Sequence, residues 1–131
     1  MPNPLKSLCA AITAGVVALL LSSGVAVAHG NTKPLHGGVI QMMGEVSFEL
    51  VTRPDGVEVY LVDDGEDVGT GGMTAKLVIA HGGTTTEAAL APGGGNRFVA
   101  PGVTLPSGAR VTVIVTMEDN ASRWTARFSI P

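Results

Sequence analysis

The sequence predicts an all-β protein: an antiparallel, seven- or eight-stranded immunoglobulin-like sandwich that follows an N-terminal signal peptide. Three observations predict this fold. Apolar and polar residues alternate in several short segments. Turn signals built on Gly, Pro, Asn and Asp separate these segments at intervals of about ten residues. The chain of 131 residues contains 18 Gly and 8 Pro, which disfavours long helices and leaves room for a single domain.

Residues 1–28 have the three parts of a secretory signal peptide. Lys6 provides the charged start, residues 8–21 form an uncharged apolar run, and Ala26-Val27-Ala28 has the Ala-x-Ala form of a cleavage site. An uncleaved membrane anchor is the alternative, because the apolar run is long. Cleavage after the last alanine would give a periplasmic or secreted protein without cysteine, because Cys9 lies in the leader.

The first expected strands follow this leader in quick succession. Residues 29–45 are expected to form an N-terminal arm that includes a weak first strand at 38–42. Strict alternation then predicts strands at 46–50 and 57–61, where every second residue is Val, Phe or Leu. The turn signal Pro54-Asp55-Gly56 separates these two strands.

The remaining strands complete the β-sandwich domain over residues 46–131. Weaker alternation predicts three strands in its middle part, at 75–80, 85–90 and 96–100. Alternation is strict again at 111–117 and 124–130. Most acidic residues of these strands stand beside Thr or Ser, so we expect them on a solvated outer face.

Charge and motifs exclude several classes of function. The chain has 8 Lys and Arg against 11 Asp and Glu, a formal net charge of −3, so its overall balance is mildly acidic. This pattern argues against binding to nucleic acid or to an anionic membrane surface. The chain has no nucleophile elbow, P-loop, H-E-x-x-H motif or paired cysteines, so we expect a protein that is not an enzyme.

Three histidines are the candidate metal ligands: His29, His36 and His81. His29 directly follows the predicted cleavage site, so its α-amine and ring Nδ1 would chelate a metal ion together. His36 would supply a third nitrogen, and Gly37-Gly38 behind it would leave space for the ion. A tetragonal set of nitrogens suits a copper ion, Cu(II) above the other common divalent ions.

Each candidate ligand has a plainer interpretation. His29 is a chance residue at a terminus, His36 a turn residue and His81 a loop residue that joins the site only if its loop lies at the same end of the domain. Met42 and Met43 are soft ligands, but adjacent strand residues point to opposite faces, so core packing is the favoured role. The acidic run 63–67 lacks EF-hand spacing and is expected to be a hairpin loop.

Four segments carry a resemblance to known proteins: Ala28-His29-Gly30, His36-Gly37-Gly38-Val39, Phe48-Glu49-Leu50-Val51 and Val59-Tyr60-Leu61-Val62-Asp63-Asp64-Gly65. With them the chain resembles small exported bacterial proteins found with copper and cobalt–zinc–cadmium efflux systems, and the N-terminal part of periplasmic adaptor subunits of such pumps. It is more loosely similar to the CopC copper carriers. Of their pattern only the N-terminal histidine matches, whereas their Asp-x-His ligand pair and Met-rich loop are absent.

The resemblance implies a periplasmic metal-binding accessory protein for heavy-metal resistance. It would buffer copper or carry it to an efflux pump or to the adaptor subunit of the pump. The alternative is a structural or adaptor-type β-sandwich that binds a periplasmic protein partner and no metal. A copper oxidase with a histidine brace is disfavoured, because aromatic residues make up only 4% of the chain and no aromatic substrate platform is evident.

Overall fold

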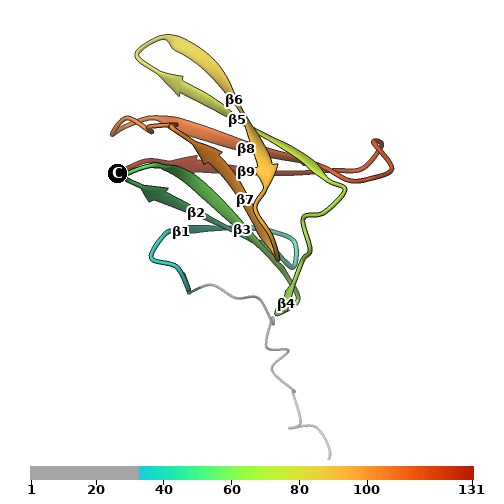
Figure 1. The fold of residues 1–131 in the computed structure, drawn as a ribbon. Helices are drawn as coiled ribbons and strands as arrows, with labels where there is room; N and C mark the ends of the chain where they lie inside the picture. The colour runs from blue at the N-terminus through green and yellow to red at the C-terminus, as the bar shows by residue number, and fades with distance from the viewer. Residues whose placement is uncertain (1–32) are drawn as a thin grey trace, which may run out of the picture.

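The computed structural model describes residues 33–131, and these form nine β-strands without a helix (Figure 1). The strands are β1 Val39–Met43, β2 Val46–Arg53, β3 Gly56–Asp63, β4 Glu66–Asp67, β5 Thr74–His81, β6 Thr84–Pro92, β7 Arg97–Pro101, β8 Arg110–Thr116 and β9 Arg123–Ser129. The all-β prediction is confirmed, and each of the eight expected strands is present. The described residues contain no helix of the length and apolarity needed to cross a membrane.

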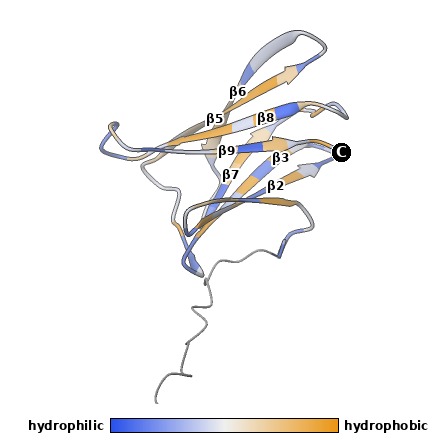
Figure 2. Cartoon of the chain, turned by 180° about the vertical axis from the view of Figure 1, so that it is seen from behind, coloured by the Kyte–Doolittle hydropathy of each residue, from blue (hydrophilic) through white to orange (hydrophobic). Residues whose placement is uncertain are grey.

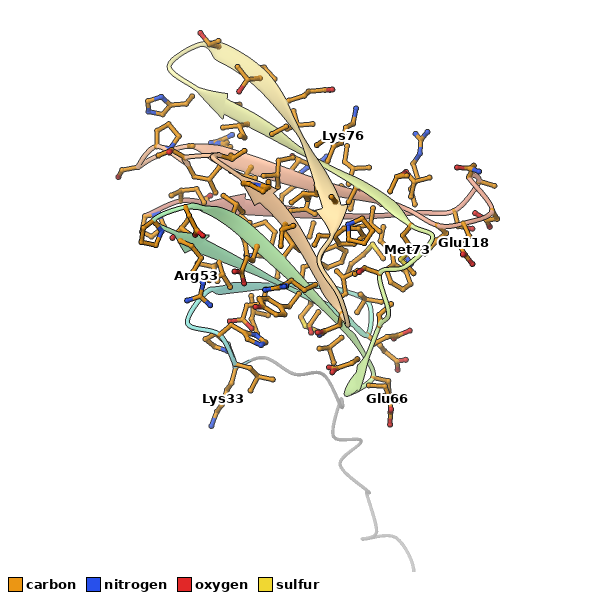
Figure 3. All side chains as sticks on the ribbon, in the orientation of Figure 1. Lys33, Arg53, Glu66, Met73, Lys76 and Glu118 are labelled. Carbon is orange, nitrogen blue, oxygen red and sulfur yellow. The ribbon has the colours of Figure 1, made fainter. Side chains whose placement is uncertain are left out.

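Residues 1–28, the predicted signal peptide, lie outside the described residues, as does His29. The only strand that the alternation pattern missed is β4, which is two residues long and pairs with the end of β3. It closes a tight hairpin over the acidic run, with Asp63 opposite Glu66. The acidic run is therefore a hairpin loop, as expected, and Glu66 projects from the lower end of the molecule in Figure 3.

All strand pairs are antiparallel, in the order β1-β2-β3-β7-β6-β5-β8-β9. β6 pairs with β5 and then, through Ala91 and Pro92, with β7, so it joins the two halves of the sheet. The two end strands, β1 and β9, lie beside each other, and the Thr125 amide donates a hydrogen bond to Met43 Sδ at 3.3 Å. The sheet therefore curls into a nearly closed barrel.

The core fills the space inside this curled sheet. Every second side chain of each long strand points inward, and Figure 2 shows hydrophobic and hydrophilic residues alternating along β8 and β9. Among the largest fully buried side chains are Phe48, Leu61, Leu77 and Phe98. Each of them stabilises the fold by about 1.5–3 kcal/mol through burial of apolar surface. Without cysteine in the described residues, this packing holds the domain together.

β2 is exceptional because it is buried on both faces. All residues from Val46 to Val51 are buried, including Ser47 and Glu49, which alternation places on the outer face. The cover is the chain just before β1, residues 33–38, which we call the covering segment. The expectation of a solvated outer face is therefore wrong for Glu49, since the covering segment shields it from water.

Candidate functional site

The candidate site lies where the covering segment crosses β2 and β3. Glu49 of β2 and Tyr60 of β3 are directly opposite each other in the antiparallel register, so both side chains project from the outer face of the sheet. His36 reaches them from the covering segment. These three residues form the His36–Glu49–Tyr60 cluster.

The Glu49 carboxylate holds the covering segment in place with four hydrogen bonds. Oε1 accepts from the backbone amides of His36, at 2.7 Å, and Gly38, at 3.0 Å. Oε2 accepts from the amide of Leu35, at 3.0 Å, and from the ring Nδ1 of His36, at 2.8 Å. Only 5% of Glu49 is exposed, so an acidic side chain is buried but fully hydrogen-bonded.

These contacts decide the charge of Glu49. Burial by itself raises the pKa of the carboxyl, but the hydrogen bonds from the His36 ring and from the amides of Gly38, His36 and Leu35 together outweigh burial. The pKa of Glu49 therefore lies below its ordinary value, and the group is a carboxylate at neutral pH. An ionised carboxylate only accepts hydrogen bonds, so Nδ1 of His36 carries the hydrogen in this contact.

The His36 ring is fixed from a second direction by Tyr60. The two rings are stacked, with centroids 3.5 Å apart and planes inclined by 6°. Such a stack contributes about 0.5–1.5 kcal/mol beyond burial. The other ring nitrogen, Nε2, has no hydrogen-bond partner within residues 33–131, and 33% of the side chain is exposed. The imidazole ring is thus held rigidly, while Nε2 stays available to bind a ligand.

Tyr60 is itself positioned by charged neighbours. Its hydroxyl donates to the Glu58 carboxylate, which lies 3.7 Å from Arg53 and 3.9 Å from Arg97. Burial, followed by the hydrogen bond and the negative charge of Glu58, raises the pKa of Tyr60. The phenol therefore stays protonated at neutral pH and keeps its ring over His36.

The two glycines after His36 allow the covering segment to lie this close to β2. Gly37 has φ +78°, a left-handed conformation that favours glycine. A Cβ on Gly38 would collide with the carbonyl oxygen of Leu50 and with the side chain of Val51. The expected role of these glycines was to make space for an ion. The structure shows that they bring the backbone against β2, and their role toward an ion stays a prediction.

Next to the cluster is a small cavity of about 150 Å³ lined by polar and apolar groups. Its lining includes His36, Glu49 and Tyr60 together with Asp67 and Asn96. The Asn96 amide donates to Asp67 Oδ1 at 3.2 Å and to the carbonyl of Leu61 at 3.0 Å, which ties β4 to the neighbouring strands. The cavity gives a small ligand access to the cluster.

The structure places the predicted ligands at different points. His36 is in the cluster, whereas His81 ends β5 at the tip of the β5–β6 hairpin, at the top of Figure 1 and far from the covering segment below. The fold therefore does not bring His81 to His36. No three His, Cys, Asp or Glu side chains gather into a metal-binding group within residues 33–131. His29 lies outside them.

Sequence reasoning identified His36 but missed the role of Glu49 and Tyr60. The alternation places both residues on the outer face of their strands, where polar side chains are normally solvated. A signal was available, because Glu49 stands in a strand that is otherwise apolar from Phe48 to Val51. Only the path of the covering segment shows that this carboxylate is buried.

Comparison of the chain with protein-family models, with curated proteins and with solved structures gave no match. The chemistry of the site is therefore inferred from its own geometry: an imidazole with a carboxylate on one nitrogen, an aromatic ring on its face and a second nitrogen without a partner in the described residues.

Proposed function

We propose that this chain is an exported periplasmic protein of the immunoglobulin-like sandwich type, with residues 1–28 as its signal peptide, that binds copper. In this proposal it buffers copper or carries it to an efflux pump, and it is not an enzyme. The observation that supports it most is the contact between His36 Nδ1 and the buried Glu49 carboxylate. This is the arrangement in which proteins present imidazole to a metal ion.

The Glu49 carboxylate favours metal binding by His36 in two ways. By accepting the Nδ1 hydrogen, it leaves the lone pair of the neutral ring on Nε2. It also increases the electron density that the ring donates to a metal, because its negative charge is only 2.8 Å from Nδ1. Stacking on Tyr60 fixes the direction of the ring, so little side-chain freedom is lost on binding.

One imidazole does not hold copper tightly, so further ligands are needed. We propose that the α-amine and ring Nδ1 of His29 supply them, seven residues before His36 in the sequence. Three nitrogens in one plane suit Cu(II). His81 is outside this proposed set, because the β5–β6 hairpin holds it at the opposite end of the fold.

Titration with Cu(II) tests this function on a chain that starts at His29. We expect one tight site, and we expect His36→Ala and Glu49→Gln each to weaken it by about tenfold or more. The affinity for Cu(II) should also decrease as the pH is lowered, because protons compete with the metal for the nitrogens. His81→Ala is the matched control and should bind like the unchanged chain.

A second chain with one extra residue before His29 separates the two parts of the site. The extension removes the free amine from the ligand set, so Cu(II) affinity should fall sharply. Equal affinity in the extended chain would remove His29 from the proposal. Equal affinity in His36→Ala would contradict the site itself and favour the alternative, an adaptor that binds a periplasmic protein partner without metal.

A further inference from the structure

The outer face of β5, β8 and β9 carries an unusual cluster of positive charge. In the strand register Thr112 pairs with Arg127, Thr116 with Arg123, and Ile114 with Lys76, so these side chains project from one side of the sheet. Arg110, two residues before Thr112 on β8, projects from the same side. We call this surface, defined by Lys76, Arg110, Arg123 and Arg127, the basic face.

The positive charge of the basic face is largely uncompensated. Among residues 33–131, the carboxylate that the strands place on this side is Glu87 of β6, which lies opposite Val78 and forms an ion pair with Lys76 at 3.1 Å. Glu118 and Asp119 lie at the end of the face, in the turn that joins β8 and β9. Within residues 33–131, none of the three arginines of this face forms an ion pair. All three are exposed. Arginines without an acidic partner are therefore available to bind an anionic group.

The rest of the molecule has the opposite charge. Eight of the 11 acidic residues lie between residues 45 and 67, and Glu118 and Asp119 lie in the turn that joins β8 and β9. The described cations outside the basic face are Lys33, Arg53 and Arg97. Figure 3 shows Lys76 projecting from the upper side and Lys33 and Arg53 from the lower side. The net charge of −3 is therefore distributed unevenly over the molecule, with positive charge concentrated on the basic face.

The basic face contains two shallow hollows, each with two cations. Arg110 and Arg127 line a hollow of about 510 Å³ together with Thr112 and Ser129. Lys76 and Arg123 line a second hollow, of about 340 Å³, together with two further threonines, Thr74 and Thr116. Each hollow thus combines two positive charges with two hydroxyl groups, a set that suits a carboxylate. The two arginines of β9 are four residues apart, which is about 13 Å on a strand.

The apolar side chains of the molecule argue against a lipid surface as the ligand. In the described part of the chain, the large hydrophobic residues that are exposed are Leu35, Val39 and Met42, and all of them lie in the covering segment or in β1. The basic face has no such side chain to insert into a bilayer. Arginine, which supplies three of its four cations, binds carboxylates with two parallel hydrogen bonds.

We propose that the basic face binds an acidic segment of a partner protein, in extended conformation along β9, with carboxylates four residues apart. One carboxylate occupies the hollow of Arg110 and Arg127, and the other occupies the hollow of Lys76 and Arg123. This interaction is independent of the copper site, because the basic face and the His36–Glu49–Tyr60 cluster lie on different halves of the sheet.

A labelled synthetic peptide tests the proposal on the full chain that starts at His29. The peptide Thr-Glu-Thr-Thr-Thr-Glu-Thr has its two glutamates four residues apart, and Thr-Thr-Glu-Glu-Thr-Thr-Thr has the same composition with the glutamates adjacent. At low salt, we expect fluorescence anisotropy to show binding of the first peptide about fivefold tighter than the second, and both weakening as salt is added. Equal binding of the two peptides, or none, would overturn the proposal.

Charge reversal locates the binding site. Arg127→Glu and Arg123→Glu should each weaken binding of the spaced peptide by about tenfold, whereas Lys33→Glu, with the same change of net charge on the opposite side, should have less than about a twofold effect. Circular dichroism establishes that each variant is folded, and Arg127→Gln serves as a milder second variant. The arginine variants should bind Cu(II) with unchanged affinity, which distinguishes loss of peptide binding from damage to the copper site.

Two other occupants would give different results. Binding to phosphatidylglycerol vesicles but to neither peptide would assign the basic face to a membrane and overturn the proposal. Concentration-dependent self-association in the ultracentrifuge that Arg127→Glu abolishes would assign it to the acidic side of a second copy of this chain. That result would also overturn it.

Discussion

At the scale of single residues, Glu49 is the most consequential side chain of the candidate site. It is an acid inside a hydrophobic strand, and it is tolerated there because four donors surround its two oxygens. Without these donors, burial would raise its pKa above the ordinary value. The same carboxylate fixes the covering segment, orients His36 and sets the nitrogen that faces a ligand. One residue thus connects local folding with the proposed chemistry.

Replacement of this carboxylate should make stability depend less on pH. The pKa of Glu49 is lowered in the folded chain, so its stabilising contribution is fully present above the ordinary value of 4.5 and is lost as pH falls through the lowered value. Glu49→Gln should therefore reduce the free energy of unfolding by about 2–3 kcal/mol at neutral pH, and by less at about pH 4, below the ordinary value. Urea denaturation at both pH values measures the difference.

Glu87→Gln is the matched control for this experiment. Glu87 is 60% exposed and pairs with Lys76 at the surface, so its loss should change the free energy of unfolding by less than about 1 kcal/mol at neutral pH. If Glu49→Gln and Glu87→Gln behave alike, the buried carboxylate does not hold the covering segment.

At the scale of elements, the covering segment and β2 act as one unit. The segment has no backbone pairing of its own in the strand ladders, and it is held by side-chain contacts to Glu49 and by the close approach of Gly38 to Leu50. A segment attached in this way opens more easily than a paired strand. The position of His36 is therefore only as stable as this attachment.

Gly38→Ala should detach the covering segment without unfolding the barrel. The new methyl group would collide with the backbone of Leu50, so the segment must move away and release the Glu49 carboxylate. We expect faster amide hydrogen exchange at residues 36 and 38, and Cu(II) affinity lower by about tenfold. Gly71→Ala is the control, because a Cβ there meets no atom within 4 Å and the backbone is not left-handed. Equal exchange in the two variants would contradict this role of Gly38.

At the scale of the whole molecule, the curled sheet separates three surfaces. The inside holds the apolar core, the outer face of β2 and β3 holds the candidate copper site, and the outer face of β5, β8 and β9 is basic. The core needs no disulfide, because the strands supply one continuous set of buried side chains. Neither outer surface contributes the large side chains of the core.

The core makes a prediction at this scale. Leu77→Ala removes a side chain that is 0% exposed, and it should reduce the free energy of unfolding by about 2–5 kcal/mol through lost burial and a cavity. Leu35→Ala removes the same groups from a side chain that is 68% exposed, and it should have an effect of less than about 0.5 kcal/mol. Urea denaturation compares the two, and equal effects would mean that the apolar core is not where the structure places it.

The distribution of charge over the surface depends on the fold and is not evident from the order of residues in the sequence. The mildly acidic net charge of the sequence argued against binding to nucleic acid or to an anionic membrane surface. In the fold, the two-residue period of β8 and β9 places Arg110, Arg123 and Arg127 on one side, because residues of one parity share a face. The strand period and the small number of acids after residue 67 (Glu87, Glu118 and Asp119) together produce the basic face in three dimensions.

The sequence by itself determined the class of fold and the strands. Alternation, turn residues and the absence of helix signals are local properties, and they predicted eight strands that the structure contains. The sequence also singled out His36 as a candidate ligand. The expectation for His29 depends on residues outside the described part and stays a prediction.

Only the tertiary structure decided which residues surround His36. Whether a strand residue is solvated depends on what another part of the chain places over it, and no local pattern contains that information. The covering segment crosses β2 and turns Glu49 from a surface acid into a buried carboxylate. The same fold separates His81 from His36 and gathers three arginines, because strand pairing brings together residues that are distant in the chain.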